Sequence, residues 1–139
     1  MSRVIVTDDI ATCHALRRTV FIGEQAVPEH EEIDGRDGEA VHLLAFDGAR
    51  PVGTARILVA GSVGKIGRVC VLREARGAGH GAALTNAALA WMADQPGIVQ
   101  ARLGAQLHAL DFYARLGFVE EGEVFLDAGI PHREMVRTL

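Results

Sequence analysis

The feature that most constrains this chain is a strand, a glycine-rich turn and a helix in direct succession between Lys65 and Met92. A short apolar run rich in Val and Ile indicates the strand, and an Ala-rich stretch with apolar residues on one stripe indicates the helix. The turn between them contains Gly77, Gly79 and Gly81. Glycine permits a positive φ and lets a ligand approach the backbone closely. Because free N–H groups at a helix start favour an anion, the segment predicts a pocket for a phosphate or pyrophosphate.

Three phosphate-binding motifs can be compared with this turn. A P-loop needs a lysine directly after its last glycine, whereas the only lysine of the chain, Lys65, precedes the glycines. The dinucleotide fingerprint G-x-G-x-x-G/A matches residues 77–82, but Asp94, the acidic residue at about the required distance of 20, precedes the next predicted strand. The pattern R/Q-x-x-G-x-G/A fits every position from Arg76 to Gly81. The remaining alternative is a turn that only caps a helix.

Size and composition predict one globular domain over residues 1–139. A chain of this length can bury roughly two-thirds of its unfolded surface. The net charge of −4 argues against nucleic-acid or anionic-membrane binding. Cys13 and Cys70 are expected to be small buried hydrophobes without a disulfide framework. The N-terminus has no signal-peptide pattern and no apolar run reaches membrane length, so a cytoplasmic location is expected.

Hydrophobic periodicity predicts the remaining elements and, with them, the fold class. The expected strands cover residues 3–6, 40–46, 51–59, 65–72, 98–103, 119–126 and 132–138, and the other expected helices cover about 9–22 and 107–116. Ala109, Phe112 and Leu116 are expected to form the core stripe of the last helix. The order of elements predicts an α/β fold of the α+β type, with a mixed, mostly antiparallel sheet and helices on its faces.

The segment over residues 23–39 is predicted to be an irregular loop with a strong acidic bias. Its carboxylates are Glu24, Glu29, Glu31, Glu32, Asp34, Asp37 and Glu39. No EF-hand spacing is present, so no metal site is predicted. The loop is either a solvated surface or one wall of a cleft for a cationic amine. Arg56 interrupts an apolar strand, and it either faces outward or faces inward and needs a carboxylate from this loop.

A second motif, A-x-x-F-Y-x-x-x-G-F, covers residues 109–118. Together with R-x-x-G-x-G earlier in the chain, it resembles the two signatures of the GNAT family of N-acetyltransferases. The R-x-x-V-F-x-x-E-Q run over residues 17–25 and G-I-P-H over residues 129–132 are similar to the ElaA-type branch of that family. The resemblance extends over essentially the whole chain and implies a GNAT-like sheet of about six to seven strands, splayed in its middle, with helices on both faces.

The resemblance implies transfer of an acetyl group from acetyl-CoA to a primary amine of a small molecule or peptide, by direct attack through a tetrahedral intermediate. In such a fold, the backbone of Val69 and Val71 would pair with the pantetheine arm, and an N–H near Val71 would stabilise the developing oxyanion. The turn would hold the pyrophosphate, so the cofactor would be fixed away from the chemistry. The implied cofactor residues are Val69, Cys70, Val71, Arg76, Gly77, Ala78, Gly79, His80, Gly81 and Gln106.

Proton transfer requires an acid and a base, and the resemblance implies that Tyr113, the only tyrosine, protonates the leaving thiolate. The alternative for Tyr113 is a half-buried helix residue with its hydroxyl in water. Glu24 is the first candidate for the base, followed by Glu32 and Asp34 and then His132. Glu32, Asp34 and Arg56 are also expected to contact the acceptor.

Two other functions would use the same turn. A catalytically silent acyl-CoA-binding module would need neither Tyr113 nor the acidic segment. A synthase with a longer acyl donor, such as a homoserine-lactone synthase, shares the R-x-x-V-F opening, but this chain is short for that group. The sequence does not define the acceptor amine, and an exposed strand pair at the C-terminal end would suit a homodimer.

Overall fold

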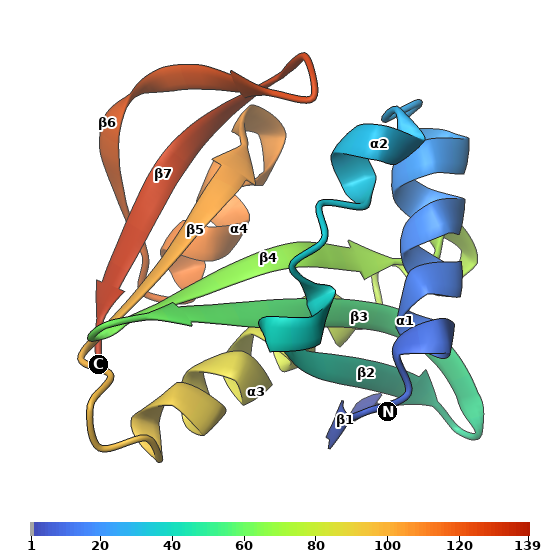
Figure 1. The fold of residues 1–139 in the computed structure, drawn as a ribbon, viewed down its shortest axis with the longest axis horizontal. Coiled ribbons are helices and arrows are strands. Elements are labelled where there is room, and N and C mark those ends of the chain that lie inside the picture. The colour runs from blue at the N-terminus through green and yellow to red at the C-terminus, as the bar shows by residue number, and fades with distance from the viewer. Residues whose placement is uncertain (1) are drawn as a thin grey trace.

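Seven strands form one sheet in the computed structural model, which describes residues 2–139. The strands are β1 Ser2–Thr7, β2 Val41–Asp47, β3 Arg50–Ala60, β4 Val63–Val71, β5 Gln100–Gln106, β6 Val119–Asp127 and β7 Ile130–Thr138. Their order is β1-β2-β3-β4-β5-β7-β6 (Figure 1). Only β4 and β5 pair in parallel. The predicted mixed, mostly antiparallel sheet is confirmed.

Helices cover both faces of this sheet (Figure 1). The α-helices are α1 Ile10–Arg17, α2 Glu29–Glu32, α3 His80–Ala93 and α4 Leu110–Arg115. The other helical turns are the π-helical η1 Arg18–Glu24 and the 3₁₀ turns η2 Asp37–Glu39, η3 Arg73–Ala75 and η4 Leu107–Ala109. Successive residues of a strand point to opposite faces, so Leu43 packs in the core under α3 whereas Leu44 packs in the core under α1.

The first helix begins as predicted, because the Asp9 side chain accepts the N–H of Thr12 at 3.2 Å. It continues through η1 beyond the predicted end at residue 22. The prediction of an irregular loop over residues 23–39 is confirmed for residues 25–28 and 33–36 and was wrong for the rest, which belongs to the end of η1, to α2 and to η2. Pro28 has the fixed φ that suits a helix start, and the carboxylates that follow it favour the positive end of the helix dipole.

The predicted helix over residues 107–116 is present as η4 followed by α4, but its predicted stripe was wrong for Phe112. Phe112 is 37% exposed, while Tyr113 is 9% exposed and belongs to the core. The 3₁₀ turn has about three residues per turn, so it shifts the phase at which α4 meets the sheet. Gly117 has φ +92° and the Phe118 N–H bonds to the Tyr113 carbonyl at 3.1 Å, so α4 ends in a glycine C-cap.

The sheet is forked between β4 and β5. These strands pair only from Val63–Gln100 to Ile66–Leu103, and beyond this point they diverge (Figure 1). Arg68 has φ +54° beside a register shift in the β3–β4 pairing, which marks a bulge in β4. A bulge bends its strand and increases the local twist, so β4 turns away from β5. The predicted splay is confirmed.

Candidate active site

A cleft of about 1260 Å³ opens at this fork. Its walls include the start of α3, both strands of the fork, the α2 segment and the β6–β7 turn. Every site residue that the sequence predicts lines the cleft except Ala78. The fold therefore brings the glycine turn, the end of β4, the second motif and the acidic segment to one place.

The glycine turn owes its residues to backbone conformation. Gly77 and Gly79 have φ of +84° and +87°, and an added Cβ would meet nothing within 4 Å at either position. Only glycine adopts this region readily, so the turn needs glycine for its path and not for close packing. Gly79 is the N-cap of α3 and no side chain caps this end. The first amide N–H groups of α3 consequently lack acceptors within the helix, at a point that faces the cleft.

Arg76 crosses from this turn to η1. Its terminal nitrogens lie 2.7 and 2.8 Å from the carboxylate oxygens of Glu24, and its Nε donates to the Val71 carbonyl at 3.0 Å. The hydrogen bonds from Arg76 lower the pKa of Glu24. A lowered pKa favours the carboxylate but weakens it as a base. Glu24 stays a prediction as the general base, and this ion pair counts against it.

The side chain of His80 bonds to β1 and not to the glycine turn. The imidazole is 2% exposed and its Nδ1 bonds to the hydroxyl of Ser2 on β1 at 2.8 Å. Cofactor binding by His80 stays a prediction, and this bond counts against a role for its side chain. Its main-chain N–H, at the first position of α3, is the group that a phosphate could still use.

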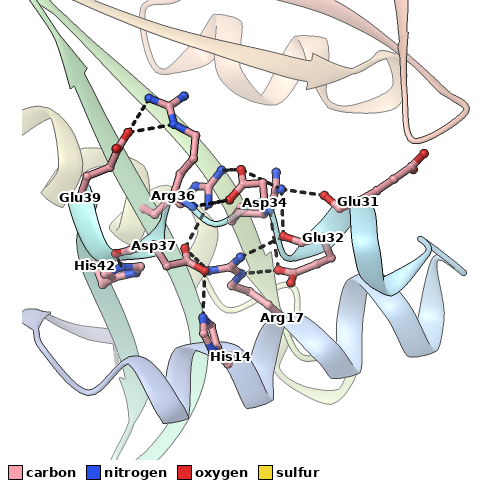
Figure 2. Close-up of polar contacts among 11 residues, drawn as sticks. His14, Arg17, Glu31, Glu32, Asp34, Arg36, Asp37, Glu39 and His42 are labelled. Atoms are coloured by element: carbon pink, nitrogen blue, oxygen red, sulfur yellow. Dashed lines mark hydrogen bonds and ion pairs between the residues drawn. The ribbon is translucent and has the colours of Figure 1, made fainter.

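The acidic segment is held to α1 and to the sheet by buried arginines (Figure 2). Arg17 is 1% exposed and bonds to Glu32 and, at 2.7 Å, to Asp37. Arg56 is 5% exposed and bonds to Asp34 at 2.9 Å and to Asp37 at 3.0 Å. The prediction that an inward-facing Arg56 needs a carboxylate from this segment is confirmed, and the outward-facing alternative is wrong.

These contacts leave little free negative charge in the segment. Hydrogen bonds from Arg56 lower the pKa of Asp34 to about 2. Burial opposes ionisation of Asp37, but bonds from Arg17 and other neighbours still lower its pKa. Glu32 and Asp34 line the cleft, yet their oxygens face arginines and not an open site. Their contact with an acceptor amine stays a prediction.

Arg68 joins the same network from the bulge of β4. Its NH2 atom lies 3.2 and 3.1 Å from the carbonyl oxygens of Glu31 and Glu32, at the end of α2. Burial and the nearby Arg56 charge lower the pKa of Arg68. The α2 segment, which forms one wall of the cleft, is thereby fixed to the strand at the fork.

Tyr113 belongs to α4, and its side chain is part of the core cluster that also contains residues of α3 and β5. Its ring packs edge-on against Phe112 and Phe118, with centroids 4.9 and 6.0 Å away. Burial raises the pKa of Tyr113 to about 12. Among residues 2–139 its hydroxyl has no hydrogen-bond partner, and the oxygen is not fully buried, so it is reachable from the cleft. The site holds a neutral hydroxyl that can donate a proton.

Comparison with known proteins identifies the arrangement. Residues 8–139 match the model of the acetyltransferase (GNAT) domain. The chain belongs to the GNAT family. YjcF of Bacillus subtilis, described as an uncharacterized N-acetyltransferase, is 41% identical to this GNAT chain over 88% of the chain and 87% of YjcF. This match and the fold make the protein an acetyltransferase.

Solved GNAT structures support the same assignment. Escherichia coli ElaA superposes with a TM-score of 0.84 and 31% identity, over 99% of this chain and 98% of ElaA. An acyl-CoA N-acyltransferase from Pseudomonas aeruginosa superposes with a TM-score of 0.84 and 32% identity, over the same shares of the two chains. The resemblance to the GNAT family and its ElaA-type branch is confirmed.

No role was predicted from the sequence for three residues of the cleft and of the polar network beside it. Arg17 carries a signal, because it stands one helical turn after the buried Cys13 and so on the core-facing stripe of α1. Its partner Asp37 and the cleft residue Gln25, which bonds to Gln106 at 3.1 Å, carry no signal of their own. No cluster of metal-ligating side chains occurs in residues 2–139, and no helix there is long and apolar enough to cross a membrane.

Proposed function

We propose that this GNAT protein transfers the acetyl group of acetyl-CoA to a primary amine of a small molecule or peptide. The observation that carries the proposal is the fork. From Gly67 to Val71, β4 has no partner on its β5 side, and this free edge leads to the glycine turn at the start of α3. An extended amide-containing arm that ends in a pyrophosphate complements both features. The names of the Bacillus and Pseudomonas relatives agree with this donor and reaction.

Each part of the cofactor would meet a different part of the cleft. The backbone of Val69 and Val71 would bind the arm as a neighbouring strand does. Binding of the arm to the Val71 carbonyl would replace the bond from Arg76. The turn from Gly77 to Gly81 would hold the pyrophosphate through its N–H groups. The cofactor would then be fixed by contacts remote from the reacting thioester, which supports catalysis by proximity.

The acetyl transfer is a single displacement. The neutral amine nitrogen bonds to the acetyl carbon, an oxyanion forms and is stabilised by a main-chain N–H near Val71, and the carbon–sulfur bond then breaks. The Tyr113 hydroxyl donates its proton to the departing thiolate. Its raised pKa keeps it protonated near neutral pH, but also makes it a weak acid, so it assists a leaving group that is already adequate.

Calorimetry with acetyl-CoA and desulfo-CoA, followed by a thiol-release assay, tests this proposal. Gly79→Trp would obstruct the turn, and Gly48→Trp is the matched control, since Gly48 has a positive φ and open surroundings but lies outside the cleft. We expect binding that only Gly79→Trp abolishes, and thiol release with at least one of n-butylamine, cadaverine, glucosamine and glycyl-lysine. Binding without release would indicate a silent acyl-CoA-binding module, and no binding would overturn the proposal.

A further inference from the structure

We infer that the imidazole of His132 is the general base that takes the proton from the attacking amine. This inference rests on the proposed function, because it assigns one proton transfer within the same reaction. His132 is 8% exposed and lines the cleft from β7, where it stands opposite Gln106 of β5. Tyr113 reaches the same cleft from α4, which follows β5 in the chain. The proposed acid and base thus enter the cleft from elements attached to the same strand.

The tautomer of His132 follows from one hydrogen bond. Its Nδ1 lies 2.6 Å from the carbonyl oxygen of Ile130. A carbonyl oxygen can only accept, so Nδ1 must carry the proton of this bond. In the neutral imidazole, the other nitrogen, Nε2, then has a free lone pair. This arrangement produces the form of histidine that a general base requires.

The local fold makes this hydrogen bond possible. Ala128 and Gly129, at the centre of the β6–β7 turn, have φ of +53° and +75°. Two successive positive φ values are characteristic of the tight type I′ hairpin, which matches the twist of its strands. On the other side, the ring of Phe125 stacks on His132, with centroids 5.7 Å apart and planes 24° from parallel. The imidazole is therefore held both in its plane and at Nδ1.

The free nitrogen is available to a substrate. In the part of the chain that the structure describes, Nε2 has no hydrogen-bond partner, and it is not among the fully buried unpaired atoms. Because the residue is otherwise buried and lines the cleft, that remaining access is to the cleft. A lone pair in such a place can accept a proton from a bound amine without prior rearrangement.

The other candidate bases in the cleft are less suited to this role. Glu24, Glu32 and Asp34 each hydrogen-bond to an arginine, and a paired carboxylate is a weaker base. Glu31 and Asp127 are solvent-exposed, and no side-chain hydrogen bond or ion pair within residues 2–139 orients them. His108 is likewise exposed, and no hydrogen bond fixes its tautomer. His80 also lines the cleft, but its Nδ1 partner is the Ser2 hydroxyl, which can donate or accept, so this bond does not fix the tautomer. Among the described residues of the cleft, only His132 has a hydrogen bond that both orients the side chain and leaves the lone pair of Nε2 unused.

The proton balance closes with these two groups. As the nitrogen–carbon bond forms, one amine proton passes to Nε2 of His132, which becomes imidazolium. As the carbon–sulfur bond breaks, the hydroxyl proton of Tyr113 passes to the thiolate, which leaves as the thiol. After product release, the imidazolium returns its proton to water and the phenolate takes one from water. Acetylated amine and free thiol are the only net products.

The test compares His132→Ala and His132→Gln with the wild type and with two matched histidine variants. His30→Ala removes an exposed histidine outside the cleft, and His108→Ala removes the exposed histidine within it. Steady-state kinetics are measured with the amine that the wild type acetylates. We expect kcat to fall about 100-fold or more in both His132 variants, as for loss of a general base. The Kd of acetyl-CoA should stay within about twofold of the wild-type value, because His132 is not part of the glycine turn that is proposed to hold the cofactor.

Rescue by added imidazole separates catalysis from structure. If Nε2 is the base, free imidazole should restore part of kcat in His132→Ala and none in the larger His132→Gln, since only alanine leaves room for it. A kcat near that of the wild type in both variants, or a loss without rescue and with altered melting, would overturn the inference while leaving the proposed function intact. A large loss in His108→Ala alone would move the role to that residue. Wild-type protein that acetylates no amine would overturn the proposed function and this inference together.

Discussion

Arg76 and Glu24 are 52 residues apart in the sequence, and they form a two-point ion pair between the glycine turn and the end of η1. Both residues line the cleft. The same guanidinium also holds the carbonyl of Val71, so one arginine connects both sides of the path proposed for the cofactor. The pair occupies the arginine of the turn that is proposed to hold the pyrophosphate.

Removal of this carboxylate should strengthen cofactor binding. In Glu24→Gln, a pyrophosphate would no longer compete with Glu24 for Arg76, and we expect the Kd of acetyl-CoA to fall about two- to fivefold at low salt, the range of a partly exposed ion pair. The kcat should change little if His132 is the base. A 100-fold loss of kcat with unchanged Kd would instead restore Glu24 as the base. Isothermal calorimetry at two salt concentrations gives the Kd, and steady-state kinetics give the kcat that distinguishes His132 from Glu24 as the base.

Arg17 should be far more important for stability than its neighbour Arg18. Replacement of Arg17 by Met removes the hydrogen-bonded arginine from buried Glu32 and one of two arginines from Asp37, and loss of one member of a buried ion pair costs about 3–5 kcal/mol. Arg18, whose side chain is 57% exposed, pairs with Glu29 at the surface, so Arg18→Met should cost less than about 1 kcal/mol. Urea denaturation of both variants measures the difference. A loss of unfolding free energy in Arg17→Met as small as that in Arg18→Met would show that the network contributes little to stability.

Acid should weaken the fold through Asp34. Its pKa falls from 3.8 to about 2 on folding, so its ionised form stabilises the native state above about pH 4, and this contribution is lost as the pH falls toward 2. The loss is less than about 2 kcal/mol, because solvent screens a carboxylate that is partly exposed. Chemical denaturation between pH 2 and 6 should therefore show a steeper decline for wild type than for Asp34→Asn. The exposed Asp47→Asn, as a control, should follow the wild-type curve.

Tyr113→Phe should slow the reaction without stopping it. The phenyl ring preserves packing against Phe112 and Phe118, while the proton donor is lost. Because a thiolate is already a fair leaving group, we expect kcat to fall about 10- to 100-fold. Thermal melting and the Kd of acetyl-CoA should be nearly unchanged. A wild-type kcat in a thiol-release assay would remove Tyr113 from the mechanism.

Gly53→Ala should disturb the sheet beside the cleft. Gly53 pairs with Val71, and an added Cβ would lie 2.9 Å from the Cys70 carbonyl and 3.1 Å from a methyl group of Leu84. Such overpacking costs about 1–3 kcal/mol. Gly97→Ala is the control, because Gly97 has no positive φ and no atom within 4 Å of the added Cβ. The two denaturation midpoints give the comparison, and equal values would contradict the expected clash.

The parts of this site that could be predicted from the sequence are those whose signal is local. The glycines of the turn, the strand before them and the helix after them are contiguous, and the second motif with Tyr113 is equally compact. Turn conformation and helix initiation depend on neighbouring residues, so these patterns predict structure directly. The predicted core stripe of α4 was wrong for Phe112 because the 3₁₀ turn η4 precedes α4 and changes which residues face the core.

The polar network could not be predicted in detail because its partners are distant in the sequence. Arg17 and Glu32 are 15 residues apart, and Arg56 and Asp34 are 22 apart. The acidic segment offers several carboxylates, and no spacing within it determines which of them turn inward. The tertiary fold alone determines which carboxylates face the arginines. The sequence does predict that an inward Arg56 needs some carboxylate, because an unpaired buried charge is too costly.

The fork in the sheet also affects how the free strand edges are protected from pairing with other protein chains. An open sheet has two edges, but this one has four, because β4 and β5 each gain a free inner edge beyond Ile66 and Leu103. Free edges invite pairing with other chains, yet the two inner ones face each other across the cleft, where another folded sheet cannot reach them. Protection against aggregation is then needed mainly at β1 and β6, and the fully exposed β6 carries three glutamates along its length. A binding edge can thus be kept open without becoming a site of self-association.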